Sequence, residues 1–407
     1  MWLSPHIRHL CVIVKIVHVI TRLLNAGSEE NTVASALHQA RAGHDVWIVH
    51  GDDFNPAWYD SLSSSVRLLE VRDMIHSVSA PKDWAAIWGL RKLYKEIKPD
   101  VVHTHQSKAG VLGRVAAIGL GVPALVHTVH IAPFLNVSAL AKTVFVFIEV
   151  MCALATDVII SVSEGMRDAC LAHGIGRRHQ HVVIHSGMPL ERYQTVTPPA
   201  DWRARIGGWG GETRPKVVLM LAAFEPRKRQ EEFLVAMDPH LKADQDLCLL
   251  FAGAGERLER VRGRAEALGI ADQVRFLGHD PEPETLIALA DVCVLTSERE
   301  GLPRVVVQYL AGGKPVILTD LPGIQEIVVP DRNGLIVPAD DVQGAAEATA
   351  ALLADPVQLD VLSLGAQATD VSPWAQDRMG AEIQQAYERV LERKGKVRLA
   401  PVSGVAA

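Results

Sequence analysis

The sequence predicts an α/β protein of two Rossmann-like, doubly wound domains that face each other across a cleft. Short apolar segments alternate with amphipathic helical patterns along almost all of the 407 residues. Such alternation is typical of parallel sheets joined by right-handed crossovers. It stops once, in a stretch rich in proline and glycine, and then resumes,. The length also fits two domains of ordinary size.

In the first half, short apolar segments predict strands at 15–20, 46–50, 101–103, 125–129, 157–162 and 181–184. Many of the predicted strands are continuous apolar runs, which suits strands that are covered on both faces of a parallel sheet. Helical patterns at 30–42, 84–97 and 164–173 separate several of them,. Residues 1–14 are interpreted as an extension ahead of the first strand.

A second series of strands is predicted at 216–221, 247–252, 274–277, 292–296, 315–319 and 335–337. We therefore expect a first domain over 1–190, a linker over 191–215 and a second domain over 216–373. A C-terminal helix at 374–393 and a disordered tail at 394–407 complete the predicted order,.

Composition excludes some functions. A net charge of −6 disfavours a nucleic-acid binder,. Five cysteines with no Cys-x-x-Cys pair predict buried, reduced thiols and a cytoplasmic protein,. The apolar run 144–155 contains Glu149 and is too short to span a bilayer,. We expect it to be a buried core helix, with peripheral contact to the inner face of a membrane as the alternative.

In doubly wound sheets, ligands bind in the loops that follow the strands. One such loop, 296–304, precedes a helix that is predicted to open near Pro303,. Gly301 allows close approach of the backbone to a ligand, and the helix start offers N–H groups to a phosphate,. Glu300 can accept hydrogen bonds from sugar hydroxyls, and plain helix capping is the alternative for this carboxylate,.

A second loop places Arg227, Lys228 and Arg229 after the strand at 216–221, which predicts a diphosphate clamp,. A solvated turn is the alternative. The glycine-rich dinucleotide fingerprint is absent from both loops that resemble it, so a nicotinamide-dependent enzyme is disfavoured and no cofactor is expected,.

Histidines also follow strands, as the pairs His103/His105 and His127/His130. A metal site is the first alternative for such pairs, but no carboxylate or cysteine lies close in sequence to complete it. We expect no metal, and we expect His130 to hydrogen-bond a substrate at the cleft.

Ordered matches to one family run from about residue 15 to 390. They are Val19-Ile20-Thr21-Arg22 and the segments 27–32, 41–46, 99–105, 107–110, 127–130, 161–164 and 300–303. On these residues the chain resembles the retaining glycosyltransferases of family 4, which have the two-domain GT-B fold.

The resemblance implies roles for individual residues. His130 would contact the donor sugar, Lys228 would neutralise the diphosphate leaving group, and Glu300 would hold the sugar hydroxyls. The donor-binding residues that it implies are Gly27, Gly301, Leu302, Pro303 and Gln308. Two positions depart from the family. Gln308 stands where the family has a glutamate, and Ala223 stands where it has an arginine, whose positive charge Arg227 or Arg229 would have to supply instead.

The implied reaction is metal-independent transfer of a hexosyl or N-acetylhexosaminyl group from a nucleotide-sugar to an acceptor hydroxyl, with retention. By the resemblance, the nucleotide is UDP. Attack on the same face is favoured over double displacement, because no obvious second carboxylate is present. The acceptor, a lipid-linked glycan, polysaccharide or small metabolite, is expected on the first domain. Candidate acceptor residues are His103, His105, Lys108 and Phe134. A GT-B nucleotide-sugar epimerase, a two-lobed sugar-binding protein and a catalytically degenerate nucleotide-sugar-binding protein are the alternatives.

Overall fold

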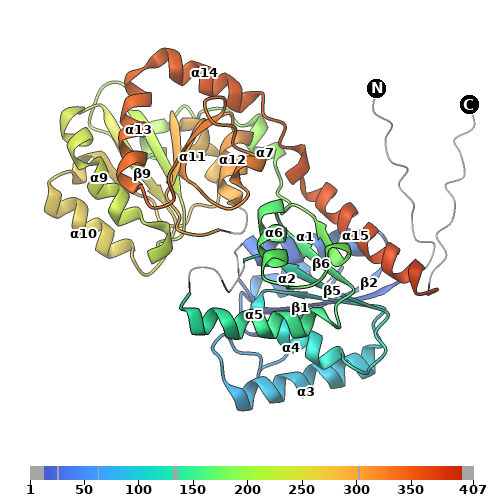
Figure 1. The fold of residues 1–407 in the computed structure, drawn as a ribbon. Helices are drawn as coiled ribbons and strands as arrows, with labels where there is room; N and C mark the ends of the chain where they lie inside the picture. Colours follow the sequence, from blue (N-terminus) through green and yellow to red (C-terminus); the bar gives the residue numbers. More distant parts are fainter. Residues whose placement is uncertain are drawn as a thin grey trace, which may run out of the picture. The chain divides into compact units, whose positions relative to one another are not determined.

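The computed structural model describes residues 13–24, 27–62, 64–131, 134, 137–300 and 303–396. The chain divides into two compact units, Met1–Gly187 with Gln376–Ala407, and Met188–Ala375. Each unit is built on one parallel sheet (Figure 1). Among the described residues, no helix is both long enough and apolar enough to cross a membrane.

The first unit contains a seven-stranded sheet in the order β3-β2-β1-β4-β5-β6-β7. Its strands are β1 (Lys15–Leu23), β2 (Asp45–Phe54), β3 (Arg67–Glu70), β4 (Val101–His105), β5 (Ala124–Val129), β6 (Val158–Ser161) and β7 (His181–Val183). Its helices are α1 (Gly27–Arg41), α2 (Ala57–Leu62), α3 (Ala80–Ile97), α4 (Ser107–Ala117), α5 (Ala139–Ala153), α6 (Glu164–Ala172) and α15 (Gln376–Arg393), with a 3₁₀ turn at Arg178–Gln180.

Helices cover both faces of this sheet. Because side chains alternate along a strand, Ile16 and Ile20 of β1 share a core with α1 and α15,. Val17 and Val19 of the same strand pack in a second core with α3 and α4. The continuous apolar runs of the sequence therefore reflect burial on both faces, as a parallel sheet requires.

The second unit contains a six-stranded sheet in the order β10-β9-β8-β11-β12-β13. The strands are β8 (Lys216–Leu221), β9 (Leu247–Ala252), β10 (Val274–Phe276), β11 (Val292–Leu295), β12 (Val316–Thr319) and β13 (Gly334–Val337). The helices are α7 (Glu191–Thr195), α8 (Trp202–Arg205), α9 (Gln230–Ala243), α10 (Leu258–Leu268), α11 (Pro283–Leu289), α12 (Arg304–Ala311), α13 (Val342–Ala354) and α14 (Pro356–Gln367). Short 3₁₀ turns occur at Pro226–Lys228, Ala271–Gln273, Ile324–Glu326 and Ser372–Trp374.

All of the predicted strands are present, and β3 is the strand that the sequence did not predict. It lies at the edge of the first sheet and is only half-buried, so it carries no continuous apolar run. At the N-terminus, Val14 is buried and its carbonyl accepts from the backbone N–H of Asp45 at 3.1 Å. Val14 therefore belongs to the fold, whereas residues 1–12 of the predicted extension and 397–407 of the predicted tail lie outside the described residues.

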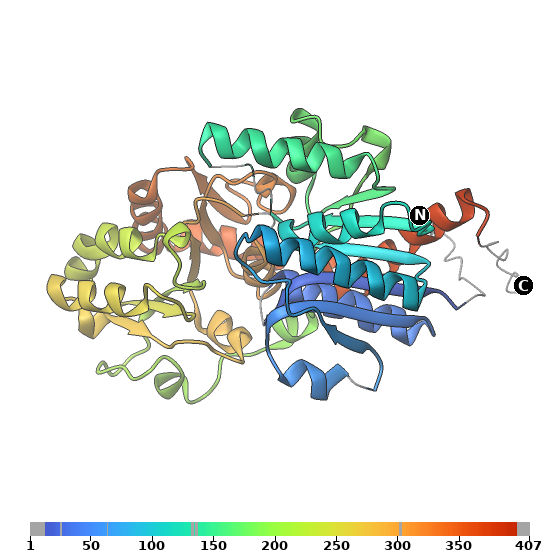
Figure 2. The same ribbon diagram turned by 90° about the horizontal axis from the view of Figure 1, so that it is seen from below.

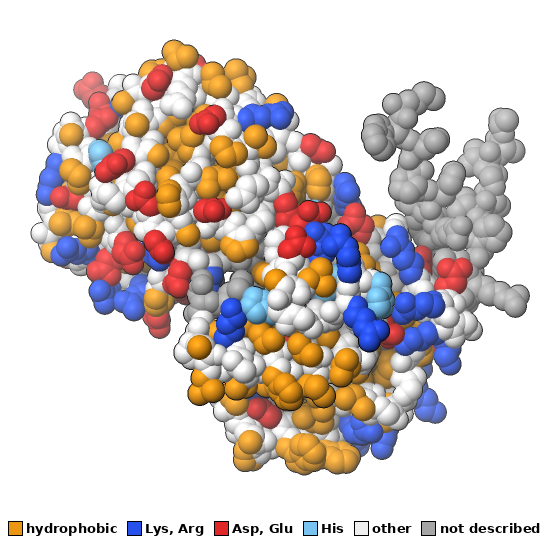
Figure 3. All heavy atoms as spheres, viewed as in Figure 1, with side chains coloured by type: hydrophobic (Ala, Val, Ile, Leu, Met, Phe, Trp, Pro, Cys, Tyr) orange, Lys and Arg blue, Asp and Glu red, His pale blue; other side chains and the backbone are white. Residues whose placement is uncertain are grey.

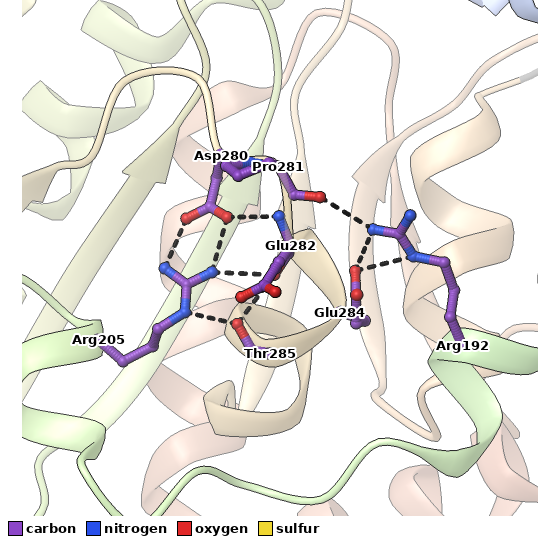
Figure 4. Close-up of polar contacts among 7 residues, drawn as sticks. All are labelled: Arg192, Arg205, Asp280, Pro281, Glu282, Glu284 and Thr285. Carbon is purple, nitrogen blue, oxygen red and sulfur yellow. Dashed lines mark hydrogen bonds and ion pairs between the residues drawn. The ribbon is translucent and has the colours of Figure 1, made fainter. Parts of the chain in front are cut away.

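The stretch that was expected to be a linker is attached to the second unit. Arg205 of α8 binds both carboxylate oxygens of Asp280 at 2.6 Å and donates from Nε to the Thr285 hydroxyl at 2.6 Å (Figure 4). Arg192 of α7 donates from Nε to Glu284 at 2.9 Å. Two-pronged arginine–carboxylate contacts are strong and directional, so they fix this segment on its unit despite its glycines and prolines.

Helix α5 differs from the buried helix that was expected. Glu149, Cys152 and Ala153 are buried, but most of the large apolar side chains of α5 are exposed. The run is apolar, as the sequence shows, but the prediction that it forms a buried core helix was wrong, because one side of the helix is exposed.

Candidate functional site

Both sheets reverse their strand order at a point where polar loops meet. In the first unit β1 and β4 are neighbours, and in the second unit β8 and β11 are neighbours. Each pair marks the place where crossovers leave in opposite directions, which opens a crevice at the carboxyl ends of the strands. The predicted site residues fall into two sets around these two points, one set on each unit.

In the second unit, Glu300 after β11 meets the basic loop after β8. Its carboxylate forms an ion pair with the Lys228 ammonium and accepts from Arg227 Nη1 at 3.0 Å. The side chains of Lys228 and Glu300 are only about a tenth exposed, at 11% and 10%. The structure thus brings together two residues that lie 72 positions apart in the sequence.

The backbone holds these loops together. The N–H of Glu298 donates to the carbonyl of Arg227 at 2.8 Å, and the Thr296 hydroxyl donates to the carbonyl of Lys228 at 3.0 Å. Arg229 takes the left-handed conformation, with φ of 57°, directly before α9. It turns to Asp340, at 2.9 Å from Nη2, so Arg227 is the arginine that shares the carboxylate with Lys228.

Neighbouring charges outweigh burial in setting the pKa values of Glu300 and Arg227. Burial alone would raise the pKa of Glu300, but Lys228 and Arg227 outweigh burial and hold that pKa below its ordinary value,. Burial likewise opposes charge on Arg227, and Glu300 and Glu225 raise its pKa in spite of it. Glu300 and Arg227 are therefore both charged at neutral pH.

The remaining donor-site predictions lie on α12. Pro303 is the N-cap residue, and the helix follows from Arg304, close to where the sequence placed its start. Gln308 is half-buried on this helix. Gly301 and Leu302 lie outside the described residues. Ala223 is exposed in the loop after β8, where the family would carry an arginine.

In the first unit, Gly27 is the first residue of α1 and lies beside a residue that the sequence reasoning missed. Gln106 has an unusual positive φ of 61°. Its Oε1 accepts from the backbone N–H groups of Thr21 and Arg22, and its Nε2 donates to Ser28 and Glu29 at 3.1 Å. It therefore ties the end of β1 to the start of α1. The only signal in the sequence was its place directly after β4.

Half-buried His130 is connected to a chain of hydrogen bonds that runs through the core of the first unit. Gln39 donates its amide N–H to the Tyr387 hydroxyl at 3.3 Å, so its Oε1 accepts from His18 Nε2 at 2.7 Å. Neutral His18 then accepts at Nδ1 from His105 Nε2, 2.9 Å away. His105 in turn accepts at Nδ1 from His130 Nε2 at 3.3 Å. The network therefore assigns the proton of His130 to Nε2.

Burial keeps His18, His103, His105 and His127 neutral. It lowers the pKa of His18 to about 4 and the pKa values of His103, His105 and His127 well below their ordinary value,. His18, His103 and His105 place one ring nitrogen each within 4.8 Å of the others, a spacing that suits a metal ion. His103 nevertheless uses both ring nitrogens in hydrogen bonds, to Tyr387 at 2.5 Å and to Thr128 at 2.7 Å.

The structure changes the interpretation of the acceptor candidates. His103 and His105 are buried, and Phe134 is buried in a small apolar cluster with Val129 and Ile159. Buried side chains offer no surface to an acceptor, so we no longer assign these three residues that role. Lys108 is half-buried and pairs with Asp83 of α3 at 2.5 Å.

Sequence comparisons identify both halves of the chain. A family model described as "Glycosyl transferase 4-like domain" matches residues 26–187, and one described as "Glycosyl transferases group 1" matches residues 208–368. The chain is 30% identical over 269 residues to the putative glycosyltransferase EpsD of Bacillus subtilis, covering 64% of this chain and 69% of EpsD. It is 27% identical over 308 residues to UDP-Gal:alpha-D-GlcNAc-diphosphoundecaprenol alpha-1,3-galactosyltransferase of Escherichia coli, covering 75% and 79% of the two chains.

Solved structures agree on the fold. Anabaena HepE in complex with UDP and glucose aligns with a TM-score of 0.77 at 20% identity, over 92% of this chain and 99% of that chain. Sucrose-phosphate synthase from Thermosynechococcus elongatus aligns with a TM-score of 0.77 at 19% identity, over 93% and 100%. The two parallel sheets, the two family matches and these relatives together show that the chain belongs to the group 1, family-4-like retaining glycosyltransferases, has the GT-B fold and uses a nucleotide-sugar donor.

Proposed function

We propose that the protein transfers a hexosyl or N-acetylhexosaminyl group from a UDP-sugar to a hydroxyl of a lipid-linked glycan. The observation that carries the proposal is the cluster of Lys228, Arg227 and Glu300 at the switch point of the second sheet. Two cations held close to one carboxylate suit a sugar diphosphate, because the carboxylate can accept from sugar hydroxyls while the cations meet the phosphates.

The same cluster explains how the bond would break. Negative charge develops on the diphosphate as the anomeric C–O bond lengthens, and fixed cations in a largely buried site stabilise that charge most strongly. Lys228 and Arg227 are held in place before a donor arrives, so they need little reorganisation. We propose that they supply the stabilisation without a divalent cation. The departing phosphate would accept the proton of the acceptor hydroxyl on the same face of the sugar.

The relatives support the choice of donor and acceptor. The Escherichia coli relative is named for a UDP-galactose donor and a diphosphoundecaprenol-linked acceptor, and HepE was solved with UDP-glucose. Other relatives are D-inositol 3-phosphate glycosyltransferases, so a small polar acceptor is the second candidate. Gln308 lacks the charge of a glutamate, and we therefore expect a weaker hold on the ribose hydroxyls.

Donor binding tests the proposal directly. The melting temperature of the full chain is measured with UDP, GDP, ADP and TDP, because a ligand at 100 times its Kd stabilises the folded state by about 2.7 kcal/mol. We expect UDP to raise it most. A preference for another nucleotide would refute the UDP assignment, and no shift with any of them at millimolar concentration would refute the donor site.

Variants of the basic loop test the mechanism. K228A and R227A should each lower turnover about 10²–10³-fold, since each removes a charge that stabilises the leaving group. R229A removes the same charge from the same loop, but its side chain turns to Asp340, so it should cost far less. Equal losses for R227A and R229A would contradict the assignment. Activity that disappears with EDTA and returns with Mg²⁺ would contradict metal independence.

A further inference from the structure

Helix α5 carries a continuous apolar stripe on its outer face. Leu140, Val144 and Phe147 are 78%, 48% and 64% exposed, and Met151 and Leu154 continue the same row. Their spacing of four, three, four and three residues places all five side chains along one side of a helix,. Exposed apolar side chains scattered singly are normal, whereas a stripe of five marks an interaction site.

A buried ion pair fixes this orientation. Glu149, on the opposite side of α5, accepts from Arg114 of α4 at 2.7 Å, and both side chains are almost fully buried. Turning α5 to hide the stripe would expose this pair or leave one charge unpaired in the interior, which is strongly unfavourable. The stripe is therefore held toward solvent by the packing beneath it.

Aromatic and basic side chains extend the surface onto α3. Trp84 and Trp88 are 62% and 53% exposed, and their rings meet edge to face at 6.1 Å. Lys92 and Lys95 follow further along the same side of α3. Helices α3, α4 and α5 lie side by side (Figure 2), and apolar side chains gather over α5 and α3 on this face of the unit (Figure 3).

The charge of this surface differs from that of the whole chain. Helices α3 and α5 together carry five basic side chains, against two acidic ones once the buried Glu149 is set aside. One of the five, Arg91, donates to the backbone carbonyls of Ala116 and Ile118, which leaves four basic side chains for the surface. The chain as a whole has a net charge of −6. An apolar stripe flanked by tryptophans and lysines matches an anionic lipid surface, where acyl chains take the apolar groups, tryptophans occupy the interface and lysines meet lipid phosphates.

We propose that α5 and α3 dock the first unit on the surface of an anionic bilayer. We call this surface, defined by Leu140, Val144, Phe147, Trp84 and Trp88 with their flanking lysines, the α5/α3 face. Docking through this face would bring the first unit to a membrane that holds the proposed lipid-linked acceptor. Only this link to the acceptor rests on the proposed function. The helices lie flat on the bilayer rather than crossing it, since none of the described helices is a membrane span.

Vesicle sedimentation of the full chain tests the proposal. The probes are vesicles of pure phosphatidylcholine and of equimolar phosphatidylcholine and phosphatidylglycerol. We expect the chain to sediment with the anionic vesicles, and binding to weaken as salt rises. The variant L140S/V144S/F147S should lower the partition coefficient at least about tenfold, because three side chains lose their apolar burial.

A matched control lies in the second unit. Val357, Val361 and Leu364 on α14 have the same spacing and are 74%, 52% and 64% exposed. V357S/V361S/L364S should bind vesicles like the unchanged chain. Melting temperatures with and without UDP are measured for both variants, so a failed donor site is recognised separately from failed docking.

Three results would overturn the proposal. One is equal vesicle binding by the unchanged chain and by L140S/V144S/F147S. Another is equal loss in both triple variants. The third is a chain that does not bind vesicles but is a dimer in light scattering and becomes a monomer in L140S/V144S/F147S, because a second copy of the chain would then cover the stripe.

Discussion

Mild acid should unfold the first unit before the second. Of the 17 histidines in the chain, only His240 and His279 lie within Met188–Ala375. In the first unit, His18 is fully buried, and burial lowers its pKa from 6.5 to about 4. The folded state therefore resists protonation of a ring that the unfolded chain protonates readily.

The sign and the size follow from linkage. Because the folded state holds the pKa of His18 below its unfolded value, neutral His18 contributes its full share to the free energy of unfolding above pH 6.5. This share is lost as the pH falls from 6.5 toward 4,. Between pH 7 and pH 5, His18 alone should lower the free energy of unfolding by roughly 2 kcal/mol. His103, His105 and His127 act in the same direction, because burial lowers their pKa values too. The roughly 2 kcal/mol from His18 alone is already a sizeable fraction of the 5–15 kcal/mol that typically stabilises a domain.

Hydrogen exchange followed by mass spectrometry can measure this effect for each unit separately. Protection of β4 and β5 should fall sharply between pH 7 and pH 5 after correction for intrinsic exchange rates, whereas protection of β9 and β11 should change little. The second unit is thus an internal control in the same tube. Equal losses in both units, or a loss below about 1 kcal/mol in β4 and β5, would refute the claim that the histidine network is neutral and buried.

Two substitutions test other parts of the structure. R114M leaves Glu149 buried without its partner and should lower the free energy of unfolding by about 3–5 kcal/mol in urea titrations, whereas R114M/E149L should recover much of the loss,. A223R restores a cation at an exposed position of the loop after β8 and should tighten UDP binding about tenfold by calorimetry,. An unchanged Kd would show that position 223 does not reach the diphosphate.

The elements that the sequence predicted well are those with fully buried strands. Continuous apolar runs marked β8, β9 and β11, because both faces of each strand are covered,. The edge strand β3 has no such run and was missed. Composition cannot tell which side of an apolar helix faces inward, so α5 was misread until the Arg114–Glu149 pair was seen.

The buried network could not be predicted because its members are far apart in the sequence. Tyr387 of α15 reaches His103 across 284 positions, and Gln39 reaches Tyr387 across 348. Helix periodicity identified a C-terminal helix, but nothing in a local pattern says that the helix packs on the first unit. Motif matching pointed to His130 itself, while the chain of rings behind it depends on the folded arrangement.

The charges around Glu300 explain how alanine at position 223 should affect the affinity for UDP. Arg227 and Lys228 contribute two positive charges, and Glu225 and Glu300 contribute two negative ones, so the ion-paired cluster is neutral overall. A diphosphate must therefore compete with two carboxylates for the same cations. With an arginine at position 223, the cluster would have a net charge of about +1,. Alanine at this position removes that net positive charge. The chemistry of charge stabilisation is retained, because both cations remain in place, while the long-range attraction for the donor is reduced. We accordingly expect weak ground-state affinity for UDP together with a strong dependence of turnover on Lys228, since an interaction that strengthens as the bond breaks affects rate more than binding.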